Sequence, residues 1–367
     1  MAEPTPHDTL DRVRRAPATL VLAVAFAAAS SCRREHRWAP QAAPSGSGAA
    51  ISREGSGPPG IARPTRERPA GPTAAPLIPT NMLAPATRIA DRIAAASDGR
   101  RAPIALHVII ISEDGLRPDA LVRANGSMHA ALMREGSFSL KARTIRHAST
   151  LPSHAAMLSG FDEPAHKLSW NSWQPERGYI QVPTIFDAAE NAGRGAAAFV
   201  GKQKLEHIAH PGSVDVFARP GFLCKRVAEE AARYFVDKRP QVEFVHFSDP
   251  DEEGHAIGWM SEPQMQAIRH ADRCLTTLVE AVKAAGLAGD TLFILSADHG
   301  GHGRNHSGRI EEDRLIPWIA WGPGVRHSHR ILAPISTMDT AATALWALGY
   351  PQPPHIEGRP VLEAFDD

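Results

Sequence analysis

The chain has 367 residues, 43% of them hydrophobic, which is enough for one large α/β domain or two ordinary ones. Its 40 Lys and Arg residues balance its 40 Asp and Glu residues, so charge gives no sign of a nucleic-acid-binding surface or of attraction to an anionic membrane. Its three cysteines have a spacing that matches no cysteine-rich metal site.

The N-terminus carries the pattern of an export signal. An arginine-rich segment precedes the apolar run 18–31, which ends in small residues before Cys32. We expect a bacterial lipoprotein signal over residues 1–32, with an acylated Cys32 that anchors an exported protein to a membrane facing the periplasm or the cell exterior. A plain secretory signal and twin-arginine export through Arg14-Arg15 stay as alternatives. A transmembrane span is disfavoured because the run is shorter than about 20 residues.

The composition changes twice along the rest of the chain. Residues 33–88 are dominated by Pro, Gly, Ala, Ser and Arg without an apolar period, which predicts a disordered tether. Residues 89–367 predict a single catalytic domain, whose fold begins between Ile89 and Ile104.

Strand-like and helix-like segments alternate in this domain. The strand-like runs are 105–111, 196–200, 242–247, 291–296 and 316–320, and the helix-like stretches are 184–192, 222–237, 262–285 and 338–348. Such alternation predicts an α/β fold with a mainly parallel central sheet covered by helices on both faces.

Acids and histidines follow three of the predicted strands. They are Asp114 after the first, Asp251 and His255 after the third, and Asp298 and His299 after the fourth. Because the carboxyl ends of parallel strands lie at one edge of a sheet, we expect these side chains to converge. Carboxylate and imidazole groups in this number fit two zinc ions about 4 Å apart.

Neighbouring acids compete for two of these positions. Asp114 is preferred to Glu113 because the residue before a glycine is better placed to face the crevice. Asp251 is preferred to Glu252 and Glu253 because the glycine-containing loop follows a buried strand directly, and the other two acids suit a solvated loop.

Thr150 precedes Pro152, which suits the first turn of a helix. The plain interpretation is a helix N-cap. A hydroxyl at that place also lies where free N–H groups attract a phosphate, and a bound metal ion would make it a nucleophile. Ser149 is the neighbouring candidate.

Four motifs occur in a fixed order: Ser112-Glu-Asp-Gly-Leu-Arg-Pro-Asp, Ser149-Thr-Leu-Pro-Ser-His-Ala-Ala-Met-Leu-Ser-Gly, Asp249-Pro-Asp-Glu-Glu-Gly-His and Ser296-Ala-Asp-His-Gly-Gly-His-Gly. From about Leu106 to the C-terminus the chain thereby resembles the alkaline phosphatase superfamily, and within it the type I phosphodiesterase and nucleotide pyrophosphatase branch. The resemblance implies an alkaline-phosphatase-like fold and two divalent metal ions, with zinc preferred.

The resemblance also implies how the ligands divide. One zinc would be held by Asp251, His255 and a late histidine, and the other by Asp114, Asp298, His299 and the nucleophile Thr150. His306 is chosen over His302 as the late histidine because the family's ligand usually lies beyond the Asp-His-Gly turn and shortly before the next strand.

Four further residues are predicted to contact substrate: Ser153, Asn171, Lys202 and His302. Ser153 stands where the family often has an asparagine. Asn171 lies between Trp170 and Trp173, which suit stacking on a base, and Lys202 suits a phosphate contact. A packed tryptophan pair and a solvated lysine are the plain alternatives.

The resemblance implies hydrolysis of phosphodiester or pyrophosphate bonds in a small phosphorylated substrate, through a phosphothreonine intermediate. Thr150 and His154 break the sulfatase pattern, so sulfatase activity is disfavoured. Phosphomonoesterase or phosphonate hydrolase activity is the alternative, and a non-catalytic metal-binding surface lipoprotein is the least favoured.

The remaining cysteines, Cys224 and Cys274, lie in helix-like segments. In an exported protein they form either a disulfide or a pair of buried thiols.

Overall fold

The computed structural model describes residues 102–306 and 309–366. The predicted signal at 1–32 with Cys32, the tether at 33–88 and the start of the domain near Ile89 lie outside the described residues. In the described part, no helix is long and apolar enough to cross a membrane.

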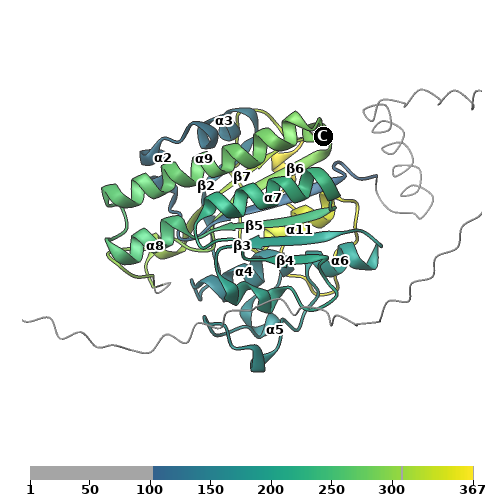
Figure 1. Ribbon diagram of the computed structural model, residues 1–367, viewed down its shortest axis with the longest axis horizontal. Coiled ribbons are helices and arrows are strands. Elements are labelled where there is room, and N and C mark those ends of the chain that lie inside the picture. The colour runs from purple at the N-terminus through teal and green to yellow at the C-terminus, as the bar shows by residue number, and fades with distance from the viewer. Residues whose placement is uncertain (1–101, 307–308, 367) are drawn as a thin grey trace, which may run out of the picture. The chain divides into compact units, whose positions relative to one another are not determined.

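An eight-stranded mixed sheet forms the centre of the described region (Figure 1). Its strands are β1 (His107–Glu113), β2 (Ser137–Arg143), β3 (Ala196–Val200), β4 (Val216–Ala218), β5 (Val242–Phe247), β6 (Thr291–Ser296), β7 (Leu315–Trp321) and β8 (His329–Arg330). The order is β4-β3-β5-β1-β6-β7-β2-β8. The first five strands in that order are mutually parallel, and β7 runs antiparallel to both β6 and β2.

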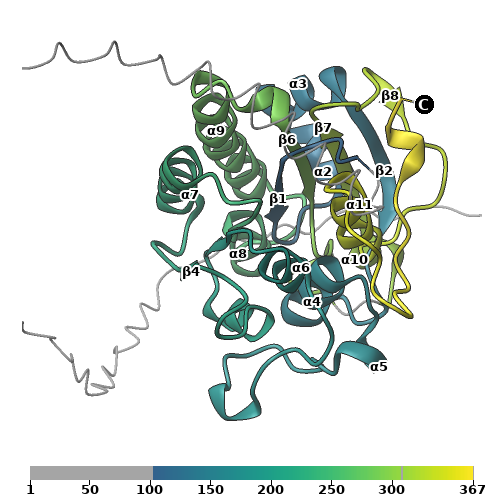
Figure 2. The same cartoon turned by 90° about the vertical axis from the view of Figure 1, so that its right-hand side faces the viewer.

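Helices cover both faces of the sheet, as Figures 1 and 2 show. On one face, α9 (Glu262–Ala284) packs against α7 (Cys224–Lys238), α2 (Pro118–Ala124) and α3 (Ser127–Glu135). On the other face, α11 (Asp339–Ala347) packs against α4 (Thr150–Ser159) and α6 (Ile185–Asn191). The other helices of the described region are α5 (Glu163–His166), α8 (Asp249–Ala256), α10 (Glu311–Arg314), η2 (Pro175–Arg177), η3 (Gln203–Ile208), η4 (Ala288–Asp290) and η5 (Leu362–Ala364).

The predicted α/β architecture is confirmed, and its physical basis is the burial of the central strands. Every residue of β3, β5 and β6 is buried, because helices lie on both faces of these strands. β3, β5 and β6 have the predicted bounds, and β1 begins two residues later than predicted. β2 is a strand that the apolar pattern did not predict.

The segment that carries Asp251 and His255 is helical, so the prediction of a glycine loop there was wrong. Pro250 lies in the first turn of α8, where its missing N–H costs nothing. Three acids in that turn interact favourably with the positive end of the helix dipole. The four-residue spacing of Asp251 and His255 is therefore one helical turn.

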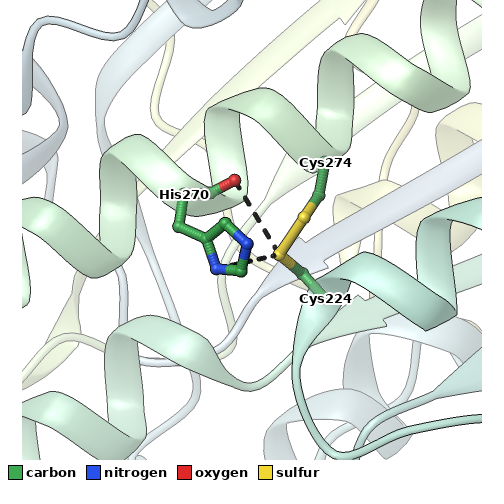
Figure 3. A group of neighbouring side chains, drawn as sticks. All are labelled: Cys224, His270 and Cys274. Carbon is green, nitrogen blue, oxygen red and sulfur yellow. Dashed lines mark hydrogen bonds between the residues drawn. A yellow bond between two sulfur atoms is a disulfide. The ribbon is translucent and has the colours of Figure 1, made fainter.

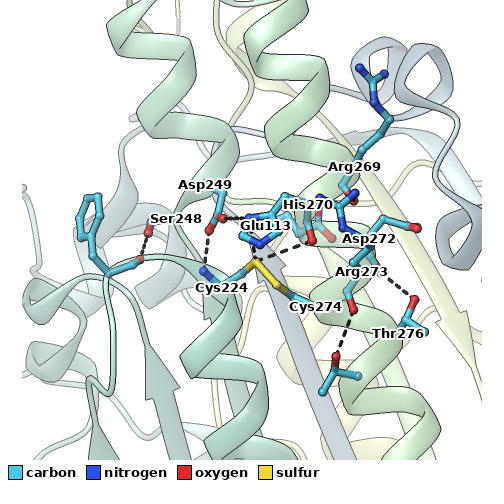
Figure 4. The surroundings of a disulfide bond; sticks show 12 residues. Glu113, Cys224, Ser248, Asp249, Arg269, His270, Asp272, Arg273, Cys274 and Thr276 are labelled. Carbon is cyan, nitrogen blue, oxygen red and sulfur yellow. Dashed lines mark hydrogen bonds and ion pairs between the residues drawn. A yellow bond between two sulfur atoms is a disulfide. The ribbon is translucent and has the colours of Figure 1, made fainter.

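A disulfide between Cys224 and Cys274 joins α7 to α9, with a Cα–Cα distance of 5.9 Å (Figure 3). The structure thus selects the disulfide from the two possibilities left by the sequence. The same corner holds the start of α8: Asp249 accepts a hydrogen bond from the Cys224 N–H at 2.8 Å and pairs with His270 at 3.0 Å (Figure 4). The disulfide and Asp249 together tie α7, α8 and α9.

Candidate metal centre and active site

Three adjacent strands, β5, β1 and β6, deliver the predicted ligands to one edge of the sheet. Asp114 follows β1, α8 follows β5, and Asp298 follows β6. Gly115 makes this approach close: its φ is +71°, and an added Cβ would lie 3.1 Å from Asp251. Its N–H also donates to Asp298 Oδ1 at 3.1 Å, so one turn brings the three strand ends together.

The first group of potential metal ligands is formed by Asp251, His255 and His306, whose ligand atoms lie within 4.8 Å of one another. Asp251 Oδ1 is 3.4 Å from His255 Nε2 and 3.9 Å from His306 Nε2. The loop after β6 therefore brings His306 onto the two ligands of α8, which are more than 50 residues away in sequence.

The second group shares Asp251 with the first and adds Asp114 and His299. His299 Nε2 is 3.5 Å from Asp114 Oδ1 and 3.2 Å from Asp298 Oδ2. The rings of His299 and His306 stack with a centroid distance of 3.7 Å, which places the two groups side by side.

Several donor atoms of these groups and of the adjacent Asp298 are buried and have no hydrogen-bond partner among the described residues. They are Asp114 Oδ1, Asp251 Oδ1, Asp298 Oδ2 and His299 Nε2. A buried polar atom without a partner is costly, and four of them in one cluster are what a cation would satisfy. Oxygen and imidazole donors suit a divalent metal such as zinc, so the residues fit the metal centre that the sequence predicts.

The charge states of the cluster point the same way. Burial raises the pKa of Asp298, and the carboxylates of Asp114 and Asp251 raise it further. Burial and the neighbouring His306 lower the pKa of His299 to about 4, so its ring is neutral at pH 7. A neutral imidazole is the form that binds a metal ion, and a divalent cation would relieve the repulsion among the three acids.

Thr150 begins α4 and is 1% exposed. Ser149 holds the N-cap position, and its side chain caps no backbone N–H. His306 Nδ1 contacts the Ala148 carbonyl at 2.7 Å, and His154 Nδ1 lies 3.5 Å from Asp298 Oδ2. The start of α4 is thus held against both ligand groups, and Thr150 lies between these two contacts in the chain.

Asn171 lies at the N-terminus of α4. Its Oδ1 accepts hydrogen bonds from the Leu151 N–H at 3.0 Å and from Lys204 Nζ at 3.1 Å. Ser153 is placed differently: its hydroxyl bonds with Thr144 Oγ1 at 3.0 Å and is fully buried. The structure therefore brings the exposed Asn171, and not the Ser153 hydroxyl, to the start of the helix.

Lys202 is buried between the ligand acids, contrary to the alternative of a solvated lysine. Its Nζ lies 2.8 Å from Asp114 Oδ2 and 2.5 Å from Asp251 Oδ2. Burial lowers the pKa of Lys202, but the two carboxylates raise it more, and its pKa ends above the ordinary value. Burial raises the pKa of Asp114, which Lys202 and His246 then lower well below its usual range.

His302 lies apart from the group that includes His306. Its Nδ1 pairs with Asp313 at 2.6 Å, and its side chain is 43% exposed. The two tryptophans also separate: Trp170 packs against the core under the Arg177 guanidinium, 3.7 Å from the ring centroid, whereas Trp173 lines a cavity.

That cavity has a volume of about 370 Å³ and opens beside the first ligand group. Asp251, His255 and Lys202 line it together with Trp173 and Arg219. A larger hollow of about 590 Å³ lies over α2 and contains none of the predicted ligands, so chemistry and not size selects the smaller one.

Two contributors to the site were missed from the sequence. His246, on β5, contacts Asp114 Oδ2 at 2.9 Å. Lys204 reaches Asn171, and the pKa of Lys204 is lowered by burial and by Lys202. His246 occupies a buried strand position, where no local pattern separates it from a core residue, whereas the Lys-Gln-Lys spacing was a usable signal for Lys204.

Comparison with known proteins agrees with this geometry. The sequence matches the family of type I phosphodiesterases and nucleotide pyrophosphatases over residues 108–318. It is 24% identical over 228 residues to human ectonucleotide pyrophosphatase/phosphodiesterase family member 5, covering 57% of this chain and 46% of the relative. It is 27% identical over 160 residues to 2,3-bisphosphoglycerate-independent phosphoglycerate mutase of Synechococcus sp., covering 39% of this chain and 28% of the relative. The chain spans less than half the length of these relatives.

Solved structures share the fold. Murine ectonucleotide pyrophosphatase/phosphodiesterase 5, in complex with AMP, aligns with a TM-score of 0.59 and 14% identity, covering 68% of this chain and 96% of that chain. A protein described as a sulfatase of Bacteroides thetaiotaomicron aligns with a TM-score of 0.58 and 17% identity, covering 71% of this chain and 74% of that chain. The family match spans more than half of the chain and includes all three ligand-bearing strand ends. The protein therefore belongs to the type I phosphodiesterase/nucleotide pyrophosphatase family, within the alkaline phosphatase superfamily.

Proposed function

We propose that the protein hydrolyses phosphodiester or pyrophosphate bonds at a centre of two divalent metal ions, with zinc preferred. The observation that carries this proposal is the convergence, beside the helix that begins at Thr150, of four buried ligand atoms that have no hydrogen-bond partner in the described part of the chain. Asp251, His255 and His306 would hold one ion, and Asp114, Asp298, His299 and Thr150 the other. Bound ions would supply charge stabilisation and favour the ionised form of the Thr150 hydroxyl.

Thr150 is the proposed nucleophile. Its Oγ1 attacks phosphorus, the bond from phosphorus to the leaving oxygen breaks, and the leaving group takes a proton from solvent. A water oxygen then attacks the phosphothreonine, the bond from phosphorus to Oγ1 breaks, and Oγ1 regains a proton. The positive end of the α4 dipole would favour the negative phosphoryl group throughout.

Asn171 and Lys204 are the proposed phosphate contacts from the chain itself. Asn171 lies at the helix start through its bond to the Leu151 N–H, and the Lys204 ammonium lies on Asn171 Oδ1. This pair replaces Ser153 in the predicted role, because the Ser153 hydroxyl is bonded to Thr144. The rest of a small phosphorylated substrate would occupy the 370 Å³ cavity, with Trp173 available for stacking.

The test is hydrolysis by the zinc-loaded full chain of three probes: an aryl phosphodiester, an aryl phosphomonoester and a dinucleoside pyrophosphate. We expect preference for the diester or pyrophosphate, with loss of turnover in Thr150→Ala and retention in the neighbouring hydroxyl variant Ser149→Ala. Preference for the monoester would make the protein a phosphatase. Normal turnover by Thr150→Ala would refute the mechanism, and no turnover by any variant would favour a binding protein.

We also propose export and lipid anchoring through Cys32. The basis is the signal pattern of residues 1–32, and the Cys224–Cys274 disulfide agrees with an oxidising compartment. Metabolic labelling with a radioactive fatty acid tests this: Cys32→Ser should lose the label and leave the membrane fraction, and an unlabelled wild-type chain would contradict the proposal.

A further inference from the structure

Lys202 forms a bridge between the two ligand groups. Its side chain is 9% exposed, and its Nζ contacts Oδ2 of Asp114 at 2.8 Å and Oδ2 of Asp251 at 2.5 Å. These two acids belong to different strand ends, β1 and β5. One ammonium therefore neutralises acids from both halves of the centre.

In each of the two acids, one carboxylate oxygen contacts Lys202 and the other does not. The Oδ2 atoms face Lys202, and Asp114 Oδ2 also contacts His246 at 2.9 Å. The Oδ1 atoms are buried without a hydrogen-bond partner among the described residues and face the histidines: Asp114 Oδ1 lies 3.5 Å from His299 Nε2, and Asp251 Oδ1 lies 3.4 Å from His255 Nε2. A metal ion held by either Oδ1 would be separated from the Lys202 ammonium by a single carboxylate.

We propose that Lys202 is an internal counter-cation of the metal centre, which stabilises the metal-free protein and weakens the binding of divalent ions. The inference rests on the metal centre of the proposed function and is independent of the substrate. It assigns Lys202 a positioning and affinity-setting role in place of the predicted phosphate contact.

Two effects of Lys202 on metal affinity oppose each other, and their magnitudes decide the sign. Holding ligand carboxylates in place typically changes metal affinity by about 10- to 100-fold. Two unit charges about 6 Å apart, roughly the span of a carboxylate with a partner on each oxygen, change a binding constant by roughly 100-fold at an effective dielectric of 20, and a divalent ion doubles the exponent. The repulsion between Lys202 and the metal ion therefore outweighs the affinity gained from holding the carboxylates in place. Removal of the Lys202 charge should strengthen metal binding.

The neighbouring cation does not compensate for this. Asp114, Asp251 and Asp298 also interact electrostatically with Lys204 and act to raise its pKa. The Nζ of Lys204 is nevertheless hydrogen-bonded to Asn171. Glu252 is the other acid near Lys202, at 3.7 Å, and its side chain is 39% exposed. Lys202 is thus the cation that directly contacts both ligand acids in the described part of the chain.

The experiment is a calorimetric titration of the metal-free full chain with zinc, which needs no substrate. Four proteins are compared: wild type, Lys202→Met, which keeps the length and removes the charge, Lys202→Arg, which keeps the charge, and Lys141→Met, which removes an exposed lysine of β2. We expect Lys202→Met to bind zinc at least 10-fold more tightly than wild type, and the other two variants to change affinity less than threefold.

Equal or weaker binding by Lys202→Met would overturn the inference and leave the proposed function intact. No zinc binding by any of the four proteins would overturn both. The predicted affinity difference without any Thr150-dependent hydrolysis would overturn only the proposed function.

Metal-free Lys202→Met is expected to lose stability, because two buried acids lose their counter-charge. If it does not fold, the variant is purified with zinc, and zinc release to a chelator is followed by colour change. Slower release than from wild type supports the inference, and equal or faster release contradicts it.

Discussion

Two buried clusters of acids and histidines lie on either side of the end of β1, and they differ in whether their ligand atoms converge on a common point. Glu113 belongs to the first: His129 Nε2 contacts Glu113 Oε1 at 2.7 Å, and the His129 N–H donates to Asp272 Oδ1 at 2.8 Å. Burial lowers the pKa of His129, but Glu113 and Asp272 raise it more, so its pKa ends above the ordinary value. This cluster joins β1, α3 and α9 through an internal ion pair.

The second cluster begins one residue later, at Asp114, on the opposite side of the strand end. Among the described residues, its donor atoms without a hydrogen-bond partner converge on common points, which those of the first cluster do not. Burial of acids beside histidines is therefore insufficient to mark a metal site. Convergence of several unsatisfied donors is the distinguishing feature, because such an arrangement costs free energy that a bound cation would recover.

The largest effect should come from breaking the second cluster at the acid that both ligand groups share. Asp251→Asn removes a charged ligand, so hydrolysis should fall roughly a thousandfold or more, since metal ions supply several kcal/mol of transition-state stabilisation. Zinc content, measured by mass spectrometry, should fall in parallel. Glu253→Gln, two residues along the same helix, is the control and should retain both. Full zinc content and turnover in Asp251→Asn would remove Asp251 from the centre.

Breaking the first cluster should change stability instead of chemistry. Glu113→Gln removes one of the two carboxylates that face the buried His129, which should cost about 3–5 kcal/mol in the free energy of unfolding. Urea unfolding measures this, with Glu135→Gln on α3 as the control. The folded fraction should still bind zinc with wild-type stoichiometry. Loss of zinc at unchanged stability would mean that the two clusters have been assigned the wrong way round.

A smaller effect, through pH, comes from a histidine that belongs to neither cluster. Burial lowers the pKa of His166 to about 4, and its Nδ1 accepts a hydrogen bond from the Leu168 N–H at 3.1 Å. Between pH 6.5 and 4 the unfolded chain binds a proton that the folded chain does not. Stability contributed by neutral His166 is therefore complete above pH 6.5 and declines by up to about 3 kcal/mol toward pH 4.

His166→Asn keeps an acceptor for the Leu168 N–H without a titrating ring. Unfolding free energies measured at pH 7, 5.5 and 4 should show a shallower decline for this variant than for wild type. Identical slopes would show that His166 titrates alike in the folded and unfolded chains.

The sequence predicted the elements whose burial is uniform. β5 and β6 are mainly apolar runs in which every residue is buried, and their ends positioned Asp251, Asp298 and His299 correctly along the chain. β2, with the sequence Ser-Phe-Ser-Leu-Lys-Ala-Arg, was missed because it mixes polar and apolar residues and pairs with β7 through a register shift. Its place in the sheet depends on long-range pairing, which no local pattern records.

The site shows the same division. Ligands that follow strands were accessible to sequence reasoning, because topology alone brings strand ends together. Sequence reasoning could not predict the bridge made by Lys202 or the pairing of Glu113 with His129. Each of these contacts joins segments whose approach depends on side-chain packing. The Cys224–Cys274 bond was undecidable for the same reason, since two helices must pack before the thiols can meet.

That disulfide closes a covalent ring around the acid that the two ligand groups share. Cys224 and Cys274 are 50 residues apart, and both β5 and α8 lie between them. A single backbone cut by a protease inside the ring would leave both fragments attached to the body of the domain. Asp251 and His255 could then be lost from the protein only after a second cut or after reduction of the bond.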